Sequence, residues 1–258
     1  MQISVWGVKP RRGLSLIELL LTLAATLFIA SLGWEAGTTA ISCANNARMA
    51  VEMSKINESL DAFCMTFGSY PPDFHDTAAV VAFFKREFPS CPQTNYPVLT
   101  RYSPASALYF WLGGPNGNGF SANPKNPFDD GKGRIGPFFQ FNPDQLKMVD
   151  GVMQYFPPRG LNGSPYVYFC GGAKGYNDNP GWPPAQPYRN SKDGSWINPK
   201  TYQVLCPGND GKFGHGCHYP NGEDYDEANF DDLTSFSRGD TMKQEMPQEA
   251  GNLEKPTE

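Results

Sequence analysis

The sequence is poor in the residues and motifs on which most enzymes depend. It has three histidines among 258 residues. It contains no G-x-S-x-G, H-E-x-x-H, phosphate-loop or dinucleotide-binding pattern. No C-x-x-C pair occurs, so neither a zinc ribbon nor a thioredoxin-like site is indicated. The net charge of -5 also lacks the basic excess typical of nucleic-acid binding. We therefore expect neither an enzyme nor a nucleic-acid-binding protein.

Turn-forming residues, in contrast, are abundant. The chain has 27 glycines and 24 prolines, and they concentrate between residues 113 and 222. This composition predicts a region rich in loops and turns. The aromatic content of 14% argues against disorder, because those rings need burial or a partner.

An apolar segment lies close to the N-terminus. Residues 14–34 hold a single charge, Glu18. The segment is also long enough for a transmembrane helix. Three basic residues precede it and place the N-terminus in the cytoplasm: Lys9, Arg11 and Arg12. A signal peptide, a lipoprotein signal ending at Cys43 and a plain membrane anchor are alternatives, but none of them gives Glu18 a role.

A lone carboxylate in an apolar segment suggests a specific function. It is costly in hydrocarbon unless it is paired. Cleavage after Gly13 would give Leu14 a free amino group. In an array of packed helices, Glu18 of one subunit could then pair with the Leu14 amine of its neighbour. A misplaced subunit would leave both charges unpaired, so this pair would set the axial register.

The N-terminal segment resembles the class III prepilin signal of type IV pilins and type II secretion pseudopilins. The shared features are a basic leader, Gly13, the sequence L-S-L-I-E and a long apolar helix. The resemblance implies cleavage after Gly13 by a prepilin peptidase, methylation at Leu14, and assembly through Glu18. Leu14 stands where phenylalanine is usual in the family.

A second helical pattern follows the apolar segment. Apolar residues recur at spacings of four and three: Met49, Met53, Ile56, Leu60, Phe63 and Phe67. This seam predicts a helix face packed on the protein's own sheet rather than a coiled coil. Gly68 and Pro71-Pro72 predict the end of the helix. The stretch FGSYPPD, residues 67–73, resembles the turn that ends this helix in major pseudopilins.

The middle of the chain predicts short elements between turns. Two short helices are expected, at 76–88 and at 103–112. A strand is expected at 165–170, and residues 136–141 are a further candidate. GSPYVYF resembles the pseudopilin W-G-x-P-Y-x-Y segment, with Leu161 in place of the tryptophan. Asp129-Asp130 fits a turn better than a metal site.

An acidic loop follows a strand at 202–206. The sequence GEDYDEANFDDL, residues 222–233, is dense in oxygen donors. Such donors suit calcium, although their spacing does not fit an EF-hand. A solvated acidic loop is the alternative. Zinc bound by four other side chains is a third interpretation: Cys206, His215, Cys217 and His218.

The pseudopilin resemblance extends to this loop. YQVLCPGNDG and DYDEANF are similar to the two pieces of the calcium loop of major pseudopilins. The resemblance implies Ca2+ bound by Asp210, Asp224 and Asp226, although the segment between the two pieces is longer here. Export favours a disulfide between Cys206 and Cys217 over zinc ligation.

We therefore predict an α+β, pilin-like fold. It comprises a long N-terminal helix with a transmembrane apolar half, a small antiparallel sheet, a loop-rich insertion and a C-terminal calcium loop. The expected organisation is a leader (1–13), a transmembrane and filament-core helix (14–34), a helix spine (35–73), the insertion (74–160), the sheet and calcium loop (161–239) and a disordered tail (240–258).

The predicted function is that of a structural subunit of a periplasmic pseudopilus, which drives protein export in type II secretion. The resemblance implies a single-pass protein of the bacterial inner membrane with a periplasmic head, which then enters a periplasmic filament. Implied partners are further copies of the chain, minor pseudopilins, a prepilin peptidase, and an inner-membrane assembly platform with its ATPase. A true type IV pilin and a membrane-anchored binding module are alternatives.

Overall fold

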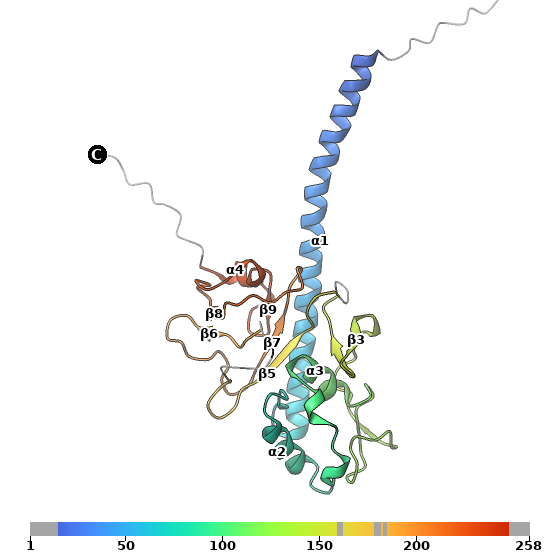
Figure 1. The fold of residues 1–258 in the computed structure, drawn as a ribbon, viewed down its shortest axis with the longest axis vertical. Coiled ribbons are helices and arrows are strands. Elements are labelled where there is room, and N and C mark those ends of the chain that lie inside the picture. The colour runs from blue at the N-terminus through green and yellow to red at the C-terminus, as the bar shows by residue number, and fades with distance from the viewer. Residues whose placement is uncertain (1–14, 159–161, 178–181, 183–184, 248–258) are drawn as a thin grey trace, which may run out of the picture. The chain divides into compact units, whose positions relative to one another are not determined.

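The computed structural model describes residues 15–158, 162–177, 182 and 185–247 (Figure 1). The chain divides into two units, Met1–Cys43 and Ala44–Glu258, and each is described by itself. Helix α1, Leu16–Phe67, contributes to both units.

Helix α1 has a sequence-encoded start and end. At its start, the Ser15 amide donates to Glu18 Oε2 at 2.9 Å and the Glu18 amide donates to Ser15 Oγ at 3.2 Å. This reciprocal pair is a capping box. At its end, Gly68 adopts a φ of 75°, and its amide donates to the Cys64 carbonyl at 2.7 Å. A left-handed glycine is the expected helix terminator, so this prediction is confirmed.

The structure corrects the prediction that the first half of this helix spans a membrane. Within the part of the chain that the structure describes, no helix combines the length and the apolar character needed to cross a membrane. Polar side chains recur in the described part of α1, among them Glu18, Thr22 and Thr26. The predicted fold class and inner-membrane localisation are therefore wrong on this point.

The second unit packs around the C-terminal part of α1. The apolar seam of this helix is buried: Met49, Ile56, Leu60 and Phe63 are 0% exposed and Met53 is 4% exposed. Phe63 lies in an aromatic cluster with Phe67, Phe83, Trp111 and Phe138. The seam thus contacts its own domain, as the heptad-like spacing predicts.

Short helices follow α1. They are α2 (Thr77–Glu87), α3 (Pro104–Leu108), the π-helical turn η3 (Tyr109–Gly113) and α4 (Met242–Glu245), with 3-10 turns at Gln93–Asn95, Leu99–Arg101, Pro143–Gln145 and Glu227–Asn229. Asp76 caps α2 by accepting the Ala78 amide at 2.8 Å. The helices predicted at 76–88 and 103–112 are confirmed, the second as α3 followed by η3.

The strands are short and form small sheets, as Figure 1 shows. Their bounds are β1 (Phe120–Ser121), β2 (Arg134–Ile135), β3 (Leu146–Val149), β4 (Val152–Tyr155), β5 (Val167–Cys170), β6 (Arg189–Asn190), β7 (Tyr202–Cys206), β8 (His218–Tyr219) and β9 (Leu233–Thr234). β1 pairs with β2 and β3 with β4, both antiparallel, whereas β6 pairs with β8 in parallel. The described residues thus form an α+β fold.

The sheet β5–β7–β9 separates two hydrophobic clusters. It is antiparallel, with β7 in the middle; Val167 lies opposite Leu205, and Leu205 opposite Thr234. Tyr168 and Val204 belong to the cluster that contains the α1 seam, while Val167, Phe169 and Leu205 belong to a second cluster. This alternation is the period of two expected of a strand with both faces covered.

Two predicted segments differ from the structure. Residues 136–141 are not a strand. The Phe138 and Phe139 amides both donate to the Leu112 carbonyl and not to the carbonyls of a neighbouring strand. The tail predicted from residue 240 includes α4, and Met242 is 0% exposed in the second cluster. Residues 248–258 lie outside the described part.

Candidate functional site

The processing site predicted from the sequence lies outside the described residues, since Gly13 and Leu14 both precede Ser15. Glu18 is described, and its carboxylate serves the capping box with Ser15. The sequence interpretation missed this local role. The signal for it was present, because S-x-x-E before an apolar run is the pattern of a capping box.

The described N-terminal part of α1 exposes large apolar side chains. Their exposed fractions run from 54% to 78% in Leu16, Ile17, Leu19, Leu20, Leu21, Leu23 and Phe28. At about 100° per residue, these positions cover an arc of about 200° around the helix axis. A helix that packs on one surface buries a stripe of about 100°. One partner surface is therefore too narrow to cover this helix.

The acidic loop begins directly after the central strand β7. The Gly211 amide donates to the Pro207 carbonyl at 3.0 Å, which forms a tight turn. Gly208 has a φ of 55°, and a Cβ atom there would lie 2.2 Å from the Asp231 carbonyl oxygen. Only glycine fits this close approach of the two loop segments.

Asp210 faces Asp231 across this turn. Its amide donates to Asp231 Oδ2 at 2.8 Å, and its own Oδ1 accepts the Lys212 amide at 2.7 Å. The next residue, Asp232, is 2% exposed. The Oδ1 atoms of Asp231 and Asp232 are buried and have no hydrogen-bond partner within the described part of the chain.

Burial and crowding act together on these carboxyl groups. Burial, followed by the charges of Asp231 and Asp210, raises the pKa of Asp232 well above its ordinary value. Burial is also the main cause of the raised pKa of Asp231. The low-dielectric surroundings thus favour the neutral form of both acids.

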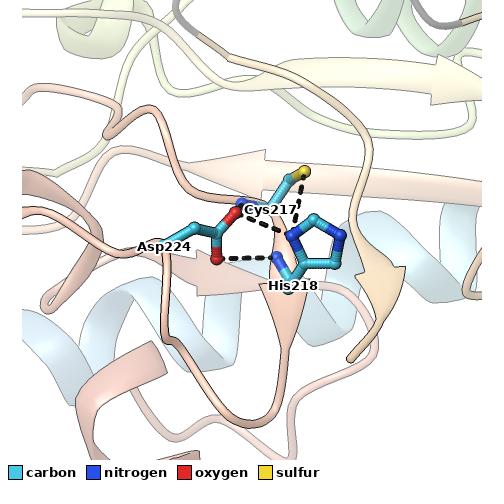
Figure 2. A group of neighbouring side chains, drawn as sticks. All are labelled: Cys217, His218 and Asp224. Atoms are coloured by element: carbon cyan, nitrogen blue, oxygen red, sulfur yellow. Dashed lines mark hydrogen bonds and ion pairs between the residues drawn. The ribbon is translucent and has the colours of Figure 1, made fainter. Parts of the chain in front are cut away.

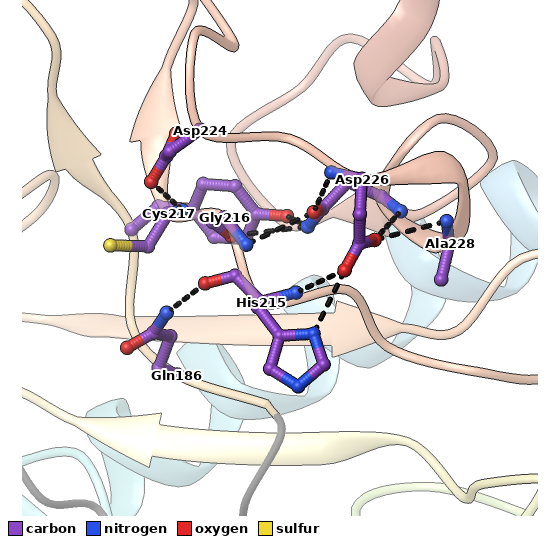
Figure 3. A network of polar contacts seen from close by, with 9 residues as sticks. Gln186, His215, Gly216, Cys217, Asp224, Asp226 and Ala228 are labelled. Atoms are coloured by element: carbon purple, nitrogen blue, oxygen red, sulfur yellow. Dashed lines mark hydrogen bonds and ion pairs between the residues drawn. The ribbon is translucent and has the colours of Figure 1, made fainter.

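Asp226 is committed to local hydrogen bonds, as Figure 3 shows. It caps the turn Glu227–Asn229 by accepting the Ala228 and Asn229 amides. It also accepts the His215 amide at 3.1 Å, and the His215 ring Nδ1 lies 2.8 Å from Asp226 Oδ2. The His215 side chain is the largest cause of the lowered pKa of Asp226.

Asp224 lies in a different group, drawn in Figure 2. It accepts the Cys217 amide at 2.8 Å and the His218 amide at 3.2 Å, and His218 Nδ1 lies 2.8 Å from Asp224 Oδ2. Burial alone would raise the pKa of Asp224, but these hydrogen bonds outweigh it and lower the pKa below its ordinary value.

The three predicted calcium ligands therefore have separate partners. In the described residues, Cys217, His218 and Asp224 are the one group of three or more potential ligands whose atoms all lie within 4.8 Å of one another. Asp210, Asp224 and Asp226 do not form such a group, and each of the three accepts backbone amides from a different part of the loop. This arrangement does not fit a calcium cage, so calcium binding stays a prediction from the resemblance.

The predicted Cys206–Cys217 disulfide is not formed in the structure, where both cysteines are free thiols. Cys206 points into the core, with its Sγ 3.5 Å from Met49 Sδ. Cys217 Sγ instead lies 4.0 Å from His218 Nδ1. The two thiols thus belong to different surroundings. Burial raises the pKa of Cys217 to about 11, and Asp224 adds to the shift.

The comparisons with known proteins identify no relative. The chain matches no protein-family model, no curated protein and no solved structure. The pilin and pseudopilin resemblance therefore depends on the residues quoted above.

Proposed function

We propose that this chain is a structural subunit of a filament of the type IV pilin and pseudopilin class. The observation that carries the proposal is the broad exposed apolar surface of α1 between Leu16 and Phe28. An apolar patch of this kind marks an interaction surface. Because it extends around about 200° of the helix, several neighbouring helices are needed to cover it.

Like helices from further copies of the chain supply such a cover. In a helical filament, each subunit contacts several identical neighbours through repeated heterologous interfaces. Glu18 then has two roles. It caps its own helix through Ser15, and its remaining negative charge pairs with the Leu14 amine of a neighbouring subunit.

Within this class we favour a pseudopilin of type II secretion over an adhesive or motile pilus. Support comes from the resemblance of residues 67–73 and of the loop after β7 to major pseudopilins. The partners in this proposal are further copies of the chain, minor pseudopilins, a prepilin peptidase and an assembly platform with its ATPase. The work of such a filament is mechanical, so no catalytic residue is assigned.

Processing provides the first test of this function. The chain is expressed with and without a prepilin peptidase, and its intact mass and N-terminal peptide are measured. We expect cleavage between Gly13 and Leu14 and a methyl group on the new amine, only when the peptidase is present. A Gly13→Leu variant serves as the uncut control. Recovery of an uncut chain, or cleavage at another bond, would contradict the proposal.

Assembly provides the second test. Processed protein, produced with the secretion machinery or with a pilus machinery, is examined by electron microscopy for filaments that contain this chain. Filaments formed only with the secretion machinery support the pseudopilin assignment. Filaments formed only with the pilus machinery would instead assign the chain to the type IV pilins. A chain that remains monomeric with both would overturn the filament function.

A further inference from the structure

The group Cys217, His218 and Asp224 combines three different kinds of metal ligand in one loop (Figure 2). A thiol, an imidazole nitrogen and a carboxylate converge, and their ligand atoms lie within 4.8 Å of one another. The pseudopilin resemblance gives a role to Asp224 alone, as an implied calcium ligand, and none to Cys217 or His218.

The distances within the group approach those of a tetrahedral metal site. Zn2+ binds sulfur at about 2.3 Å and nitrogen or oxygen at about 2.0–2.2 Å, which places sulfur and nitrogen ligands about 3.6 Å apart and nitrogen and oxygen ligands about 3.3 Å apart. Here, Cys217 Sγ is 4.0 Å from His218 Nδ1, and His218 Nδ1 is 2.8 Å from Asp224 Oδ2. Shifts of about half an ångström would bring both pairs to the ligand spacing of zinc.

The backbone of the loop positions these ligands. β8 pairs with β6 in parallel, with His218 opposite Arg189, and the Arg189 amide donates to the Cys217 carbonyl at 2.7 Å. The Gly222 amide donates to the His218 carbonyl at 3.0 Å, so the chain turns back. Asp224 then accepts the Cys217 and His218 amides. These backbone hydrogen bonds hold the group together through the Asp224 carboxylate, without the Cys217 sulfur or the His218 ring.

A cavity adjoins the group and offers room for an additional ligand. It measures about 270 Å³ and is lined by Ser191, His218, Asn221, Glu223 and Asp224. The Ser191 hydroxyl oxygen is buried and has no hydrogen-bond partner among the described residues. A buried hydroxyl without a partner is unfavourable, and a metal-bound water in this cavity would provide one.

The chemistry of the donors selects the class of metal. Calcium prefers six to eight oxygen ligands, whereas thiolate and imidazole ligands favour zinc and related transition metals. We propose that Cys217, His218 and Asp224 form a binding site for a Zn2+-class divalent metal ion, with water as a fourth ligand. This site differs from the zinc set considered from sequence, because Cys206 is buried against Met49 and His215 pairs with Asp226.

Metal titration of the full chain tests the site. Protein freed of metal in a non-thiol reductant is titrated with Zn2+ and, separately, with Co2+, whose thiolate charge-transfer absorption reports a metal–sulfur bond. We expect one ion per chain. Cys217→Ser and His218→Gln should each weaken Zn2+ binding at least about tenfold, and Cys217→Ser should abolish the charge-transfer band.

His215→Gln is the matched control. His215 forms the same 2.8 Å contact with an aspartate in the same loop, but it has no thiol in its group. The His215→Gln variant should bind Zn2+ as the wild type does. An equal loss of affinity in this variant, or retained affinity in Cys217→Ser, would overturn the site.

Protection from alkylation tests the same site without any substitution. Zn2+ should slow the alkylation of Cys217, mapped by mass spectrometry, and should leave the exposed Cys43 unchanged. Excess Ca2+ added to the Zn2+-bound protein should not restore the alkylation rate of Cys217. Equal alkylation of Cys217 with and without Zn2+ would overturn the proposal. This result is independent of filament assembly, so the two proposals can fail separately.

Discussion

At the scale of single residues, Glu52 connects α1 to β4, to the residue directly before β5 and to the turn Pro143–Gln145. The Tyr155 hydroxyl donates to its Oε1, and the Tyr166 hydroxyl donates to its Oε2 at 2.7 Å. Gln145 Nε2 lies 3.1 Å from both carboxylate oxygens. Hydrogen bonds to a charged group contribute more than neutral ones, about 1.5–3 kcal/mol each. Glu52 therefore holds the β3–β4 hairpin and β5 against the helix.

A Glu52→Gln substitution should reveal this role. The amide keeps the shape of the side chain but loses the charge, and its NH2 group cannot accept from a tyrosine. We expect the free energy of unfolding to fall by about 1–3 kcal/mol in a urea titration. Glu58→Gln is the control, because Glu58 is an exposed position on the same helix, and it should change little. Equal effects of the two substitutions would mean that the tyrosine contacts are not stabilising.

The contribution of Asp232 to folding stability should change with pH in the direction opposite to that of most carboxylates. Its pKa is raised in the folded state, mainly by burial, so the folded chain binds the proton more tightly than the unfolded chain. The stability contributed by this proton is fully present below the ordinary pKa. It is lost as the pH rises through the raised folded value.

The variant Asp232→Asn should remove this loss. At pH 8 we expect it to be more stable than the wild type by about 1 kcal/mol or more, with the advantage shrinking towards pH 4. Thermal melts across this range, in chelator, measure the difference. Asp193→Asn is the control, because hydrogen bonds from Ser195 lower the pKa of Asp193 and no gain at high pH is expected. A wild type that is more stable than Asp232→Asn at pH 8 would contradict the prediction.

At the scale of elements, one glycine inside α1 and one directly after it provide a matched pair. Gly68 ends the helix with a φ of 75°, whereas Gly37 lies inside it with nothing within 4 Å of a Cβ. Alanine at position 68 is strained, so Gly68→Ala should destabilise the chain by about 1 kcal/mol. Alanine at 37 should instead raise helix content, by about 0.5–1 kcal/mol of helix stability. Circular dichroism during urea unfolding separates the two, and effects of the same sign would contradict this assignment.

Elements with local signals were predictable from the sequence. Asp76 before an apolar face predicted α2, and the β-branched and aromatic runs predicted β5 and β7. The apolar stretch at 136–141 was misassigned, because its amides bind Leu112, which is distant in sequence. The predicted membrane span was also wrong, and the S-x-x-E pattern of Ser15 and Glu18 predicts a local capping role that the charge of Glu18 alone does not.

The loop after β7 was predictable in composition but not in arrangement. The sequence shows that the loop is rich in acidic residues, but sequence order does not show which carboxylate contacts which partner. The turn at Gly222 brings Asp224 back to Cys217 and His218, while Asp226 turns to His215. These groupings arise from tertiary contacts of the loop with β6 and from its own turns, which a linear spacing rule does not capture.

At the scale of the whole molecule, the filament proposal and the capping box assign different roles to Glu18, and two substitutions distinguish them. Glu18→Gln removes the charge but keeps an oxygen that can accept the Ser15 amide, because glutamine also serves in capping boxes. Ser15→Ala keeps the charge but removes the hydroxyl that accepts the Glu18 amide, which should weaken the cap by about 1 kcal/mol.

If Glu18 sets the register through the Leu14 amine, Glu18→Gln should abolish filaments in electron micrographs, while Ser15→Ala should reduce their number only slightly. Processing at Gly13 should be the same in both, which intact mass verifies. If capping is the whole role of Glu18, the order reverses, with normal filaments from Glu18→Gln and fewer from Ser15→Ala. That reversed order would remove the charge pair from the assembly mechanism, because a neutral side chain would then support the same packing.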